Sequence, residues 1–375
     1  MNRLILVGNG FDLAHGMRTS YNDFIFSYFH ECFKVAEKET LYSDLLINIK
    51  RGHYYNTIDL SKITELSQLL EFAELGANYS YSFGGDNSIE KKANSKAYVL
   101  ELKNDFLREV ILDLDYTKWV DIENKYYQFL LKALKIDNRL AKFKIVEDLN
   151  KAMDFIILKL EAFLKEQRSL MLLPQYGVIF NEWIKHEDIV FRFGLNESIK
   201  PFKTLFLNFN YTNTIDQYLN RSNEFRLNSS NFEINYIHGK IGDKNNPIVF
   251  GFGDELDKEY SSVEGESVQG FLKFIKSFWY SKTSNYHDLI RFIESEKFQV
   301  FILGHSCGLS DRTMLNMIFE HENCKSIKIY YHSNNGTNNF TILTEEISRH
   351  FTKKAEMRKK IVPFDKSQPM PQVAK

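Results

Sequence analysis

The chain has few of the residues that mark several classes of protein. Its 375 residues include only three cysteines, Cys32, Cys307 and Cys324, and none of them forms a CxxC pair. Neither a disulfide scaffold nor a zinc-binding cysteine pair is therefore predicted. No apolar run approaches the roughly 20 residues that cross a bilayer, and the opening MNRLILVGNG does not have the pattern of a secretory signal. These absences predict a cytoplasmic protein without a membrane partner.

An excess of charge of either sign is also missing, because 48 Lys and Arg residues balance 49 Asp and Glu residues. Nucleic acid is therefore not expected as a partner, since a phosphate backbone favours a basic surface. A nuclease is disfavoured further, because no carboxylates are spaced like a metal site. A small anionic ligand needs only a local pocket and stays open. With 43% hydrophobic residues, the chain can build a substantial core.

Short apolar runs alternate with helical patterns at both ends of the chain. Such runs fit buried parallel strands, and they are found at residues 3–7, 204–208, 233–237, 248–250, 299–303 and 326–331. Helical spacing is found at residues 21–38, 264–279, 284–296, 311–320 and 343–360. This alternation predicts an α/β fold with a Rossmann-like parallel sheet flanked by helices.

The middle of the chain has a different pattern, with almost no strand signal. Amphipathic helical stretches occupy residues 58–75, 91–114, 119–134, 139–170 and 176–186. We predict a helical insertion over 58–198 in a discontinuous nucleotide-binding core of residues 1–57 and 199–350. Helices that cover one face of the sheet are the alternative, because layered α/β folds need them. The polar, proline-containing segment 361–375 is predicted to be a flexible tail.

The loop Gly8-Asn9-Gly10-Phe11-Asp12 follows the first strand. Its glycines would let backbone N–H groups approach a pyrophosphate. The third glycine of a GxGxxG fingerprint is replaced by Leu13, so a tight turn explains the loop equally well. Asp12 would bind near a ribose or serve as a turn residue.

Two further strands end in polar loops. Asn210 and Tyr211 follow the strand TLFLN, where ligands of open α/β sheets collect. His238 precedes Gly239 at the end of another strand, and a histidine that titrates near neutrality can act as a general base. A structural histidine is the alternative at this position.

The last such loop, Gly304 to Asp311, has the sequence GHSCGLSD. Gly304 and Ser306 suit close contact with a ribose or a phosphate, and Ser310 or Asp311 would cap the following helix. A GxSxG nucleophile elbow is disfavoured, because no Asp and His follow at convincing strand ends.

Several segments together resemble the AbiH family of abortive-infection proteins. They are GNGFDLAHGMRTSYNDF, FNYTNTID, YIHG, VFGFGDE and LGHSCGLSD, in the family's order, within residues 1–30 and 204–320. That family is similar to sirtuin-like NAD-binding proteins, including effectors that cleave NAD. The resemblance implies that Gly8 to Gly10 hold the pyrophosphate, that Gly304 and Ser306 hold the adenosine side, and that Asn210 and His238 are catalytic.

The chain departs from the sirtuin-like pattern at two points. Thr212 stands where an NYD-like segment has its aspartate, and the four zinc cysteines of deacylating sirtuins are missing. The second departure argues against protein deacylation and predicts no metal.

We therefore expect an NAD⁺ glycohydrolase of anti-phage defence, with Asn210 and His238 as its catalytic residues. NAD⁺ is expected as the substrate, and its binding is assigned to Gly8, Asn9, Gly10, Asp12, Tyr211, Gly304, Ser306 and Asp311. The alternative is a sensor that binds a nucleotide signal without hydrolysing it and acts through a partner. A second copy of the chain or another defence protein would be that partner.

Overall fold

The computed structural model describes residues 1–52, 58–75, 96–112, 119–167, 171–190 and 197–373. The chain forms two compact units, one made of residues 1–19 and 164–375 and the other of residues 20–163. The predicted helical insertion over residues 58–198 coincides with neither unit, because residue 58 lies within the second unit and residue 198 within the first.

The first unit is built on a six-stranded sheet in which every pairing is parallel. Its strands are β1 (Asn2–Val7), β6 (Thr204–Asn208), β7 (Phe232–Tyr236), β8 (Phe298–Leu303), β9 (Cys324–Tyr331) and β12 (Gln368–Pro369). Their order across the sheet is β12-β9-β8-β1-β6-β7. Along the chain, β6 and β7 are added on one side of β1, and β8, β9 and β12 are then added on its opposite side. The prediction of a parallel α/β sheet flanked by helices is confirmed.

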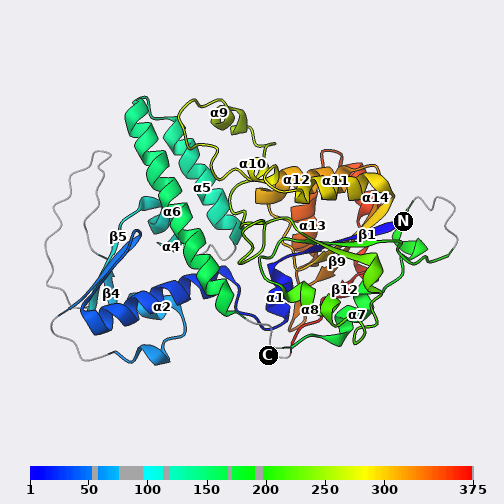
Figure 1. Cartoon of the computed structure of the whole chain (residues 1–375), viewed down its shortest axis with the longest axis horizontal. Coiled ribbons are helices and arrows are strands. Elements are labelled where there is room, and N and C mark those ends of the chain that lie inside the picture. Colours follow the sequence, from blue (N-terminus) through cyan, green and yellow to red (C-terminus); the bar gives the residue numbers. More distant parts are fainter. Residues whose placement is uncertain (53–57, 76–95, 113–118, 168–170, 191–196, 374–375) are drawn as a thin grey trace. The chain divides into compact units, whose positions relative to one another are not determined.

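Helices cover both faces of this sheet, because its strands are apolar on both faces. All six residues of β1 are buried. One face packs on α11 (Asn285–Ser295), α12 (Arg312–Glu320) and α13 (Phe340–Ser348). The other packs on α1 (Asn9–Ala14), α7 (Pro174–Phe180) and α8 (Thr214–Asn220). Figure 1 shows these two layers above and below the sheet.

The remaining elements of this unit are short. They are α9 (Tyr260–Glu264), α10 (Lys276–Tyr280), α14 (Lys354–Lys360), the hairpin of β10 (Ser333–Asn334) and β11 (Thr337–Asn338), and the 3₁₀ turns η2 (His186–Asp188), η3 (Ser229–Asn231), η4 (Leu309–Asp311) and η5 (Phe364–Lys366). The strand predicted at residues 248–250 is wrong, since these residues are buried in an irregular segment.

The end of the chain corrects the predicted flexible tail over residues 361–373. Gln368 and Pro369 form the edge strand β12 beside β9. The backbone N–H of Met370 donates to the carbonyl of Tyr331, and the Met370 side chain is buried. A polar composition indicated a loose tail, but pairing with the edge of β9, burial of Met370 and a hydrogen bond from Tyr176 to the carbonyl of Pro371 hold the segment.

The second unit contains a small sheet as well as helices. Its strands β2 (Leu41–Ser43), β3 (Ile47–Arg51), β5 (Tyr98–Leu102) and β4 (Ala73–Leu75) lie in that order. Its helices are α2 (Tyr21–Glu39), α3 (Leu66–Glu71), α4 (Asp105–Leu112), α5 (Trp119–Leu134) and most of α6 (Arg139–Glu166), with the 3₁₀ turn η1 (Leu60–Lys62).

The helices predicted over residues 58–75 and 91–114 are wrong where β4 and β5 form. Burial alternates along β5 with the period of two that marks a strand, and residues 91–95 lie outside the described part of the chain. Helix α2 begins where the sequence predicted, since Ser20 and Asp23 form a capping box.

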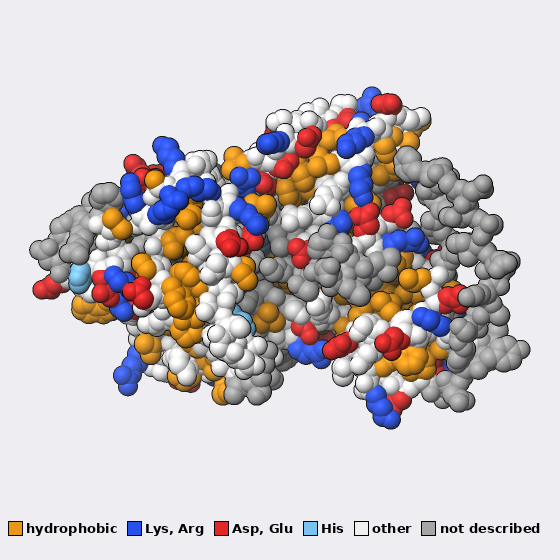
Figure 2. Space-filling model, turned by 180° about the vertical axis from the view of Figure 1, so that it is seen from behind, with side chains coloured by type: hydrophobic (Ala, Val, Ile, Leu, Met, Phe, Trp, Pro, Cys, Tyr) orange, Lys and Arg blue, Asp and Glu red, His pale blue; other side chains and the backbone are white. Residues whose placement is uncertain are grey.

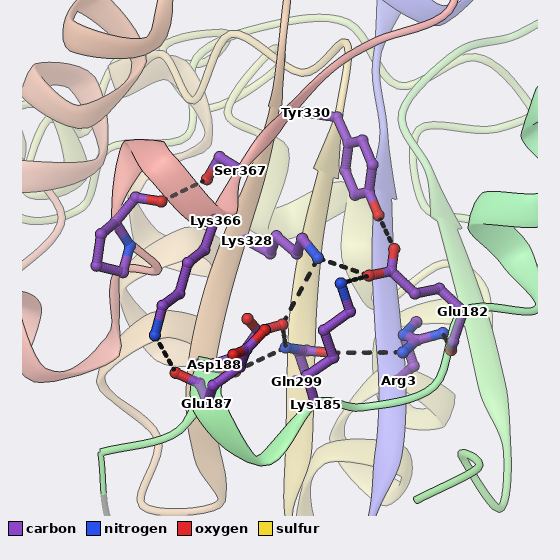
Figure 3. Close-up of polar contacts among 12 residues, drawn as sticks. Arg3, Glu182, Lys185, Glu187, Asp188, Gln299, Lys328, Tyr330, Lys366 and Ser367 are labelled. Atoms are coloured by element: carbon purple, nitrogen blue, oxygen red, sulfur yellow. Dashed lines mark hydrogen bonds and ion pairs between the residues drawn. The ribbon is translucent and has the colours of Figure 1, made fainter. Parts of the chain in front are cut away.

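A network of charged side chains is buried on the face of the main sheet that α7 covers (Figure 3). Its members are Arg3, Glu182, Asp188, Gln299, Lys328 and Tyr330. The ammonium group of Lys328 lies 2.6 Å from Glu182 Oε1 and 3.6 Å from Asp188 Oδ2. The guanidinium of Arg3 donates to the Glu182 carbonyl and lies over the ring of Phe301. Arg3 and Lys328 therefore face Glu182 and Asp188 in this interior, and the partly exposed Lys185 also lies 3.5 Å from Glu182 Oε1.

The described surface carries both signs of charge. In Figure 2, Lys and Arg side chains alternate with Asp and Glu, with apolar side chains exposed between them. Within the described residues, no helix is both long enough and apolar enough to span a membrane.

Candidate active site at the carboxyl edge of the sheet

Two glycine loops interlock where β1 and β8 end. Gly304 has φ of +71°, and a Cβ atom there would lie 2.2 Å from the backbone nitrogen of Phe11. A Cβ on Gly8 would lie 2.5 Å from the Cα of His305. The N–H of Gly10 donates to the carbonyl of Gly304 at 2.9 Å. The glycines are thus required because the two loops pack backbone against backbone.

Asn210 connects this pair of loops to the end of β6. Its side-chain amide donates to the carbonyl of Gly8 at 3.0 Å, and its backbone N–H donates to Asn208 Oδ1 at 3.1 Å. Asn208 therefore acts as a turn residue, while Asn210 carries its amide across to the loop after β1.

Asp12 lies in the same region, on α1, and is buried. The hydroxyl of Thr212 donates to Asp12 Oδ2 at 2.6 Å. Burial raises the pKa of the Asp12 carboxyl to about 6, although the hydrogen bond from Thr212 opposes this change. Thr212, which stands at the aspartate position of the sirtuin-like pattern, thus binds a carboxylate that comes from α1.

The raised pKa of Asp12 makes stability depend on pH. Its usual pKa is 3.8 and the folded value is about 6, so its favourable contribution is complete below about pH 4 and is lost as the pH rises through 6. Relative to the Asp12→Asn variant, the wild-type protein should lose about 2.5 kcal/mol of unfolding free energy between pH 4 and pH 7. Urea unfolding at both pH values measures this difference. The exposed Asp365→Asn change is the control, and a pH-independent difference for Asp12→Asn would contradict the assignment.

His238 lies at the end of β7 beside Asp311 of η4. Its Nε2 is 3.1 Å from Asp311 Oδ1, without the alignment of a hydrogen bond. Burial, together with the charge of Lys276, lowers the pKa of His238 to about 4. The imidazole is therefore neutral at pH 7 and can accept a proton.

Three residues that the sequence did not single out complete this site. Lys276 of α10 is buried, and its Nζ lies 2.8 Å from Asp311 Oδ1. The Nε2 of His305 is 3.7 Å from Asp311 Oδ2. The ring of Phe209 contacts both histidines, at centroid distances of 5.0 Å to His238 and 4.0 Å to His305. The sequence marks the glycine loop that contains His305. Nothing in the helical pattern around Lys276 distinguishes this lysine from a solvent-exposed one.

The other predicted binding residues lie around this centre. Asn9 Oδ1 accepts from Thr19 at 2.7 Å, and the hydroxyl of Tyr211 donates to the carbonyl of Val249 at 3.2 Å. Ser306 is exposed. The roles of these residues in binding NAD⁺ stay predictions, as do those of Gly8, Gly10, Asp12, Gly304 and Asp311.

The centre is enclosed in this structure. Asp12, Asn210, His238 and Asp311 are each no more than 8% exposed. A buried neutral imidazole can position and deprotonate a water molecule. Among the described residues, no group of three or more His, Cys, Asp or Glu side chains could hold a metal ion.

Comparison with known proteins gives one family. The family model described as "Bacteriophage abortive infection AbiH" matches residues 4–333. No match to this chain was found among the curated proteins or the solved structures.

Proposed function

Because this chain belongs to the AbiH family of bacteriophage abortive-infection proteins, we propose that it defends against phage by hydrolysing the nicotinamide–ribose bond of NAD⁺. The observation that carries this proposal is the site at the carboxyl edge of the sheet. There the amide of Asn210 reaches the loop after β1, and a neutral His238 lies beside Asp311.

The order of the strands supports a dinucleotide as the ligand. Counted as they enter the sheet, β7-β6-β1-β8-β9-β12 read 3-2-1-4-5-6, which is the order of Rossmann dinucleotide-binding folds. Ligands of such sheets bind where the order reverses, here between β1 and β8. The interlocked loops of Gly8 and Gly304 occupy that position.

We assign NAD⁺ to this edge in a sirtuin-like manner. The loop of Gly8, Asn9 and Gly10 would contact the pyrophosphate, and Gly304 and Ser306 would contact the adenosine side. In this assignment Asp12, Tyr211 and Asp311 lie towards the nicotinamide ribose, with Asn210 holding the ribose hydroxyls. No metal takes part in the proposed reaction.

The reaction needs one base and one oriented water. As the glycosidic bond breaks, its electron pair passes to the pyridinium nitrogen, so nicotinamide leaves as a neutral molecule. The ribose gains oxocarbenium character, and the oxygen of water bonds to its anomeric carbon. The proton of that water passes to His238.

The first test is nicotinamide release from NAD⁺ by the purified protein. Asn210→Ala is expected to lower kcat/KM about tenfold or more, because a hydrogen bond to a charge-developing group contributes roughly 1.5–3 kcal/mol. The exposed Asn245→Ala change, which removes the same amide elsewhere, should leave the rate unchanged. If the wild-type protein binds NAD⁺ but releases no nicotinamide, the proposed hydrolase function is contradicted.

The enclosure of the site favours a second candidate function. Since Asn210 already donates to Gly8 and the central side chains are buried, the site would also suit a sensor that holds a nucleotide without turning it over. The output would then pass to a second copy of the chain or to another defence protein. Calorimetry with NAD⁺ and ADP-ribose separates the two functions, since binding without product formation identifies the sensor.

A further inference from the structure

The role of the segment VFGFGDE is not explained by the assignments above. Its Gly253 lies between two other segments, because a Cβ there would be 2.6 Å from the carbonyl oxygen of Ser310 and 3.3 Å from the Cβ of Lys276. The N–H of Lys276 donates to the carbonyl of Phe252 at 2.8 Å, and the N–H of Thr313 donates to that of Gly253 at 3.2 Å. The segment thus fixes the start of α10 against η4.

This packing brings a lysine into the interior. Lys276 is only 1% exposed, although lysine is almost never buried without a partner. Its partner is Asp311, with 2.8 Å between Nζ and Oδ1. The same oxygen lies 3.1 Å from Nε2 of His238. One carboxylate therefore contacts both the ammonium group and the candidate base.

The titratable groups that face His238 are Asp311, His305, Lys276 and Tyr280. His305 does not supply the positive charge in this arrangement, because its Nδ1 accepts the backbone N–H of Cys307 at 3.0 Å, so its proton lies on Nε2. The ring of Tyr280 stacks over His238 at 6.5 Å and brings no cation. Lys276 is the cation beside Asp311.

We propose that Lys276 is a positioning residue for His238, because its ammonium group supplies the positive charge that the buried Asp311 requires and leaves the imidazole free to accept a proton. Without it, the isolated carboxylate would be neutralised by protonating His238, and an imidazolium cannot act as a base. Burial alone would raise the pKa of Asp311, but Lys276 and His238 hold it well below its usual range. The charge arrangement stands in the ligand-free protein, and only its catalytic consequence rests on the proposed function.

The test is the titration of His238 by NMR in wild type and in Lys276→Met, without NAD⁺. We expect the wild-type imidazole to titrate near pH 4, in line with its lowered pKa, and that of the variant to titrate at least one pH unit higher. Lys276→Gln keeps a hydrogen-bond donor for Asp311 and should give the same upward shift if the methionine variant does not fold. Lys276→Arg keeps the charge and should restore the low value.

Two comparisons complete the experiment. Lys276→Met combined with Asp311→Asn removes both charges and should return His238 to titration at low pH, because its burial remains. The exposed Lys258→Met change should leave the titration unmoved. If His238 titrates at the wild-type pH in both neutral Lys276 variants, the proposal is overturned, whether or not NAD⁺ is hydrolysed. If the pKa of His238 rises in the variants but wild type releases no nicotinamide, the proposed hydrolase activity is contradicted and the role of Lys276 stands.

Discussion

The His238→Ala variant is expected to release nicotinamide from NAD⁺ about 10²–10⁴-fold more slowly than wild type, the usual loss for a general base. The imidazole is enclosed, and burial with the nearby Lys276 lowers its pKa to about 4. His238 is therefore unprotonated at pH 7. Because the active form is the neutral ring, kcat/KM of wild type should be constant near neutrality and fall as the pH drops through about 4.

A matched control separates this role from packing. His332 is exposed, so His332→Ala removes an imidazole without touching the site and should retain full activity. His238→Gln keeps much of the volume beside Phe209 and should be as slow as the alanine variant. Activity of His238→Ala within threefold of wild type would remove His238 from the proposed mechanism.

Lys328→Met is expected to lower the free energy of unfolding by about 3–5 kcal/mol, because breaking a buried ion pair leaves its partner uncompensated. Lys328 is fully buried and contacts both Glu182 and Asp188. Burial would raise the pKa of Glu182, but Lys328, together with Tyr330 and Lys185, holds it below its usual value. The variant would therefore leave the buried Asp188 and the largely buried Glu182 with only Arg3 and the partly exposed Lys185 as nearby cations (Figure 3). Urea unfolding of the full chain measures the loss.

An exposed pair on the same sheet provides the comparison. Lys203 lies 3.1 Å from Glu233, and both side chains are more than half exposed, at 59% and 56%. Lys203→Met should therefore cost about 1 kcal/mol or less. Lys328→Met combined with Glu182→Gln restores the balance of charge and should recover part of the loss. Equal costs for the two lysine variants would contradict the buried network.

The strands of the main sheet were predictable because they are buried on both faces. The runs at 204–208 and 299–303 coincide with β6 and nearly all of β8, since continuous apolar runs bounded by polar loops admit few other structures. Strand β12 was not predictable, because two residues at an edge carry no periodic signal. The sequence predicts helix where β5 forms, because an alternation of apolar and polar residues over only five positions is easily lost within a long amphipathic window.

The candidate site was predictable only in part, for a related reason. Asn210 and His238 stand directly after strands, where their residue types are conspicuous in a local sequence. Lys276 contacts Asp311 across 35 positions of the chain, and nothing local distinguishes a buried lysine from a solvated one. The sequence indicates that the glycines matter but does not indicate which segments they pack against. The contact between Gly8 and Gly304 joins two loops that are brought together only by the sheet.

The central place of β1 has a consequence for synthesis of the chain. β1 is synthesised before the other strands of the main sheet, and its neighbours β6 and β8 are residues 204–208 and 298–303. At roughly 5–20 residues per second, translation from β1 to the end of β8 takes about 15–60 seconds. During that time the apolar segment LILV lacks β8, and for roughly the first two thirds of it β6 is missing as well. We therefore expect the nascent β1 segment to be bound by chaperones until β6 and β8 have been synthesised.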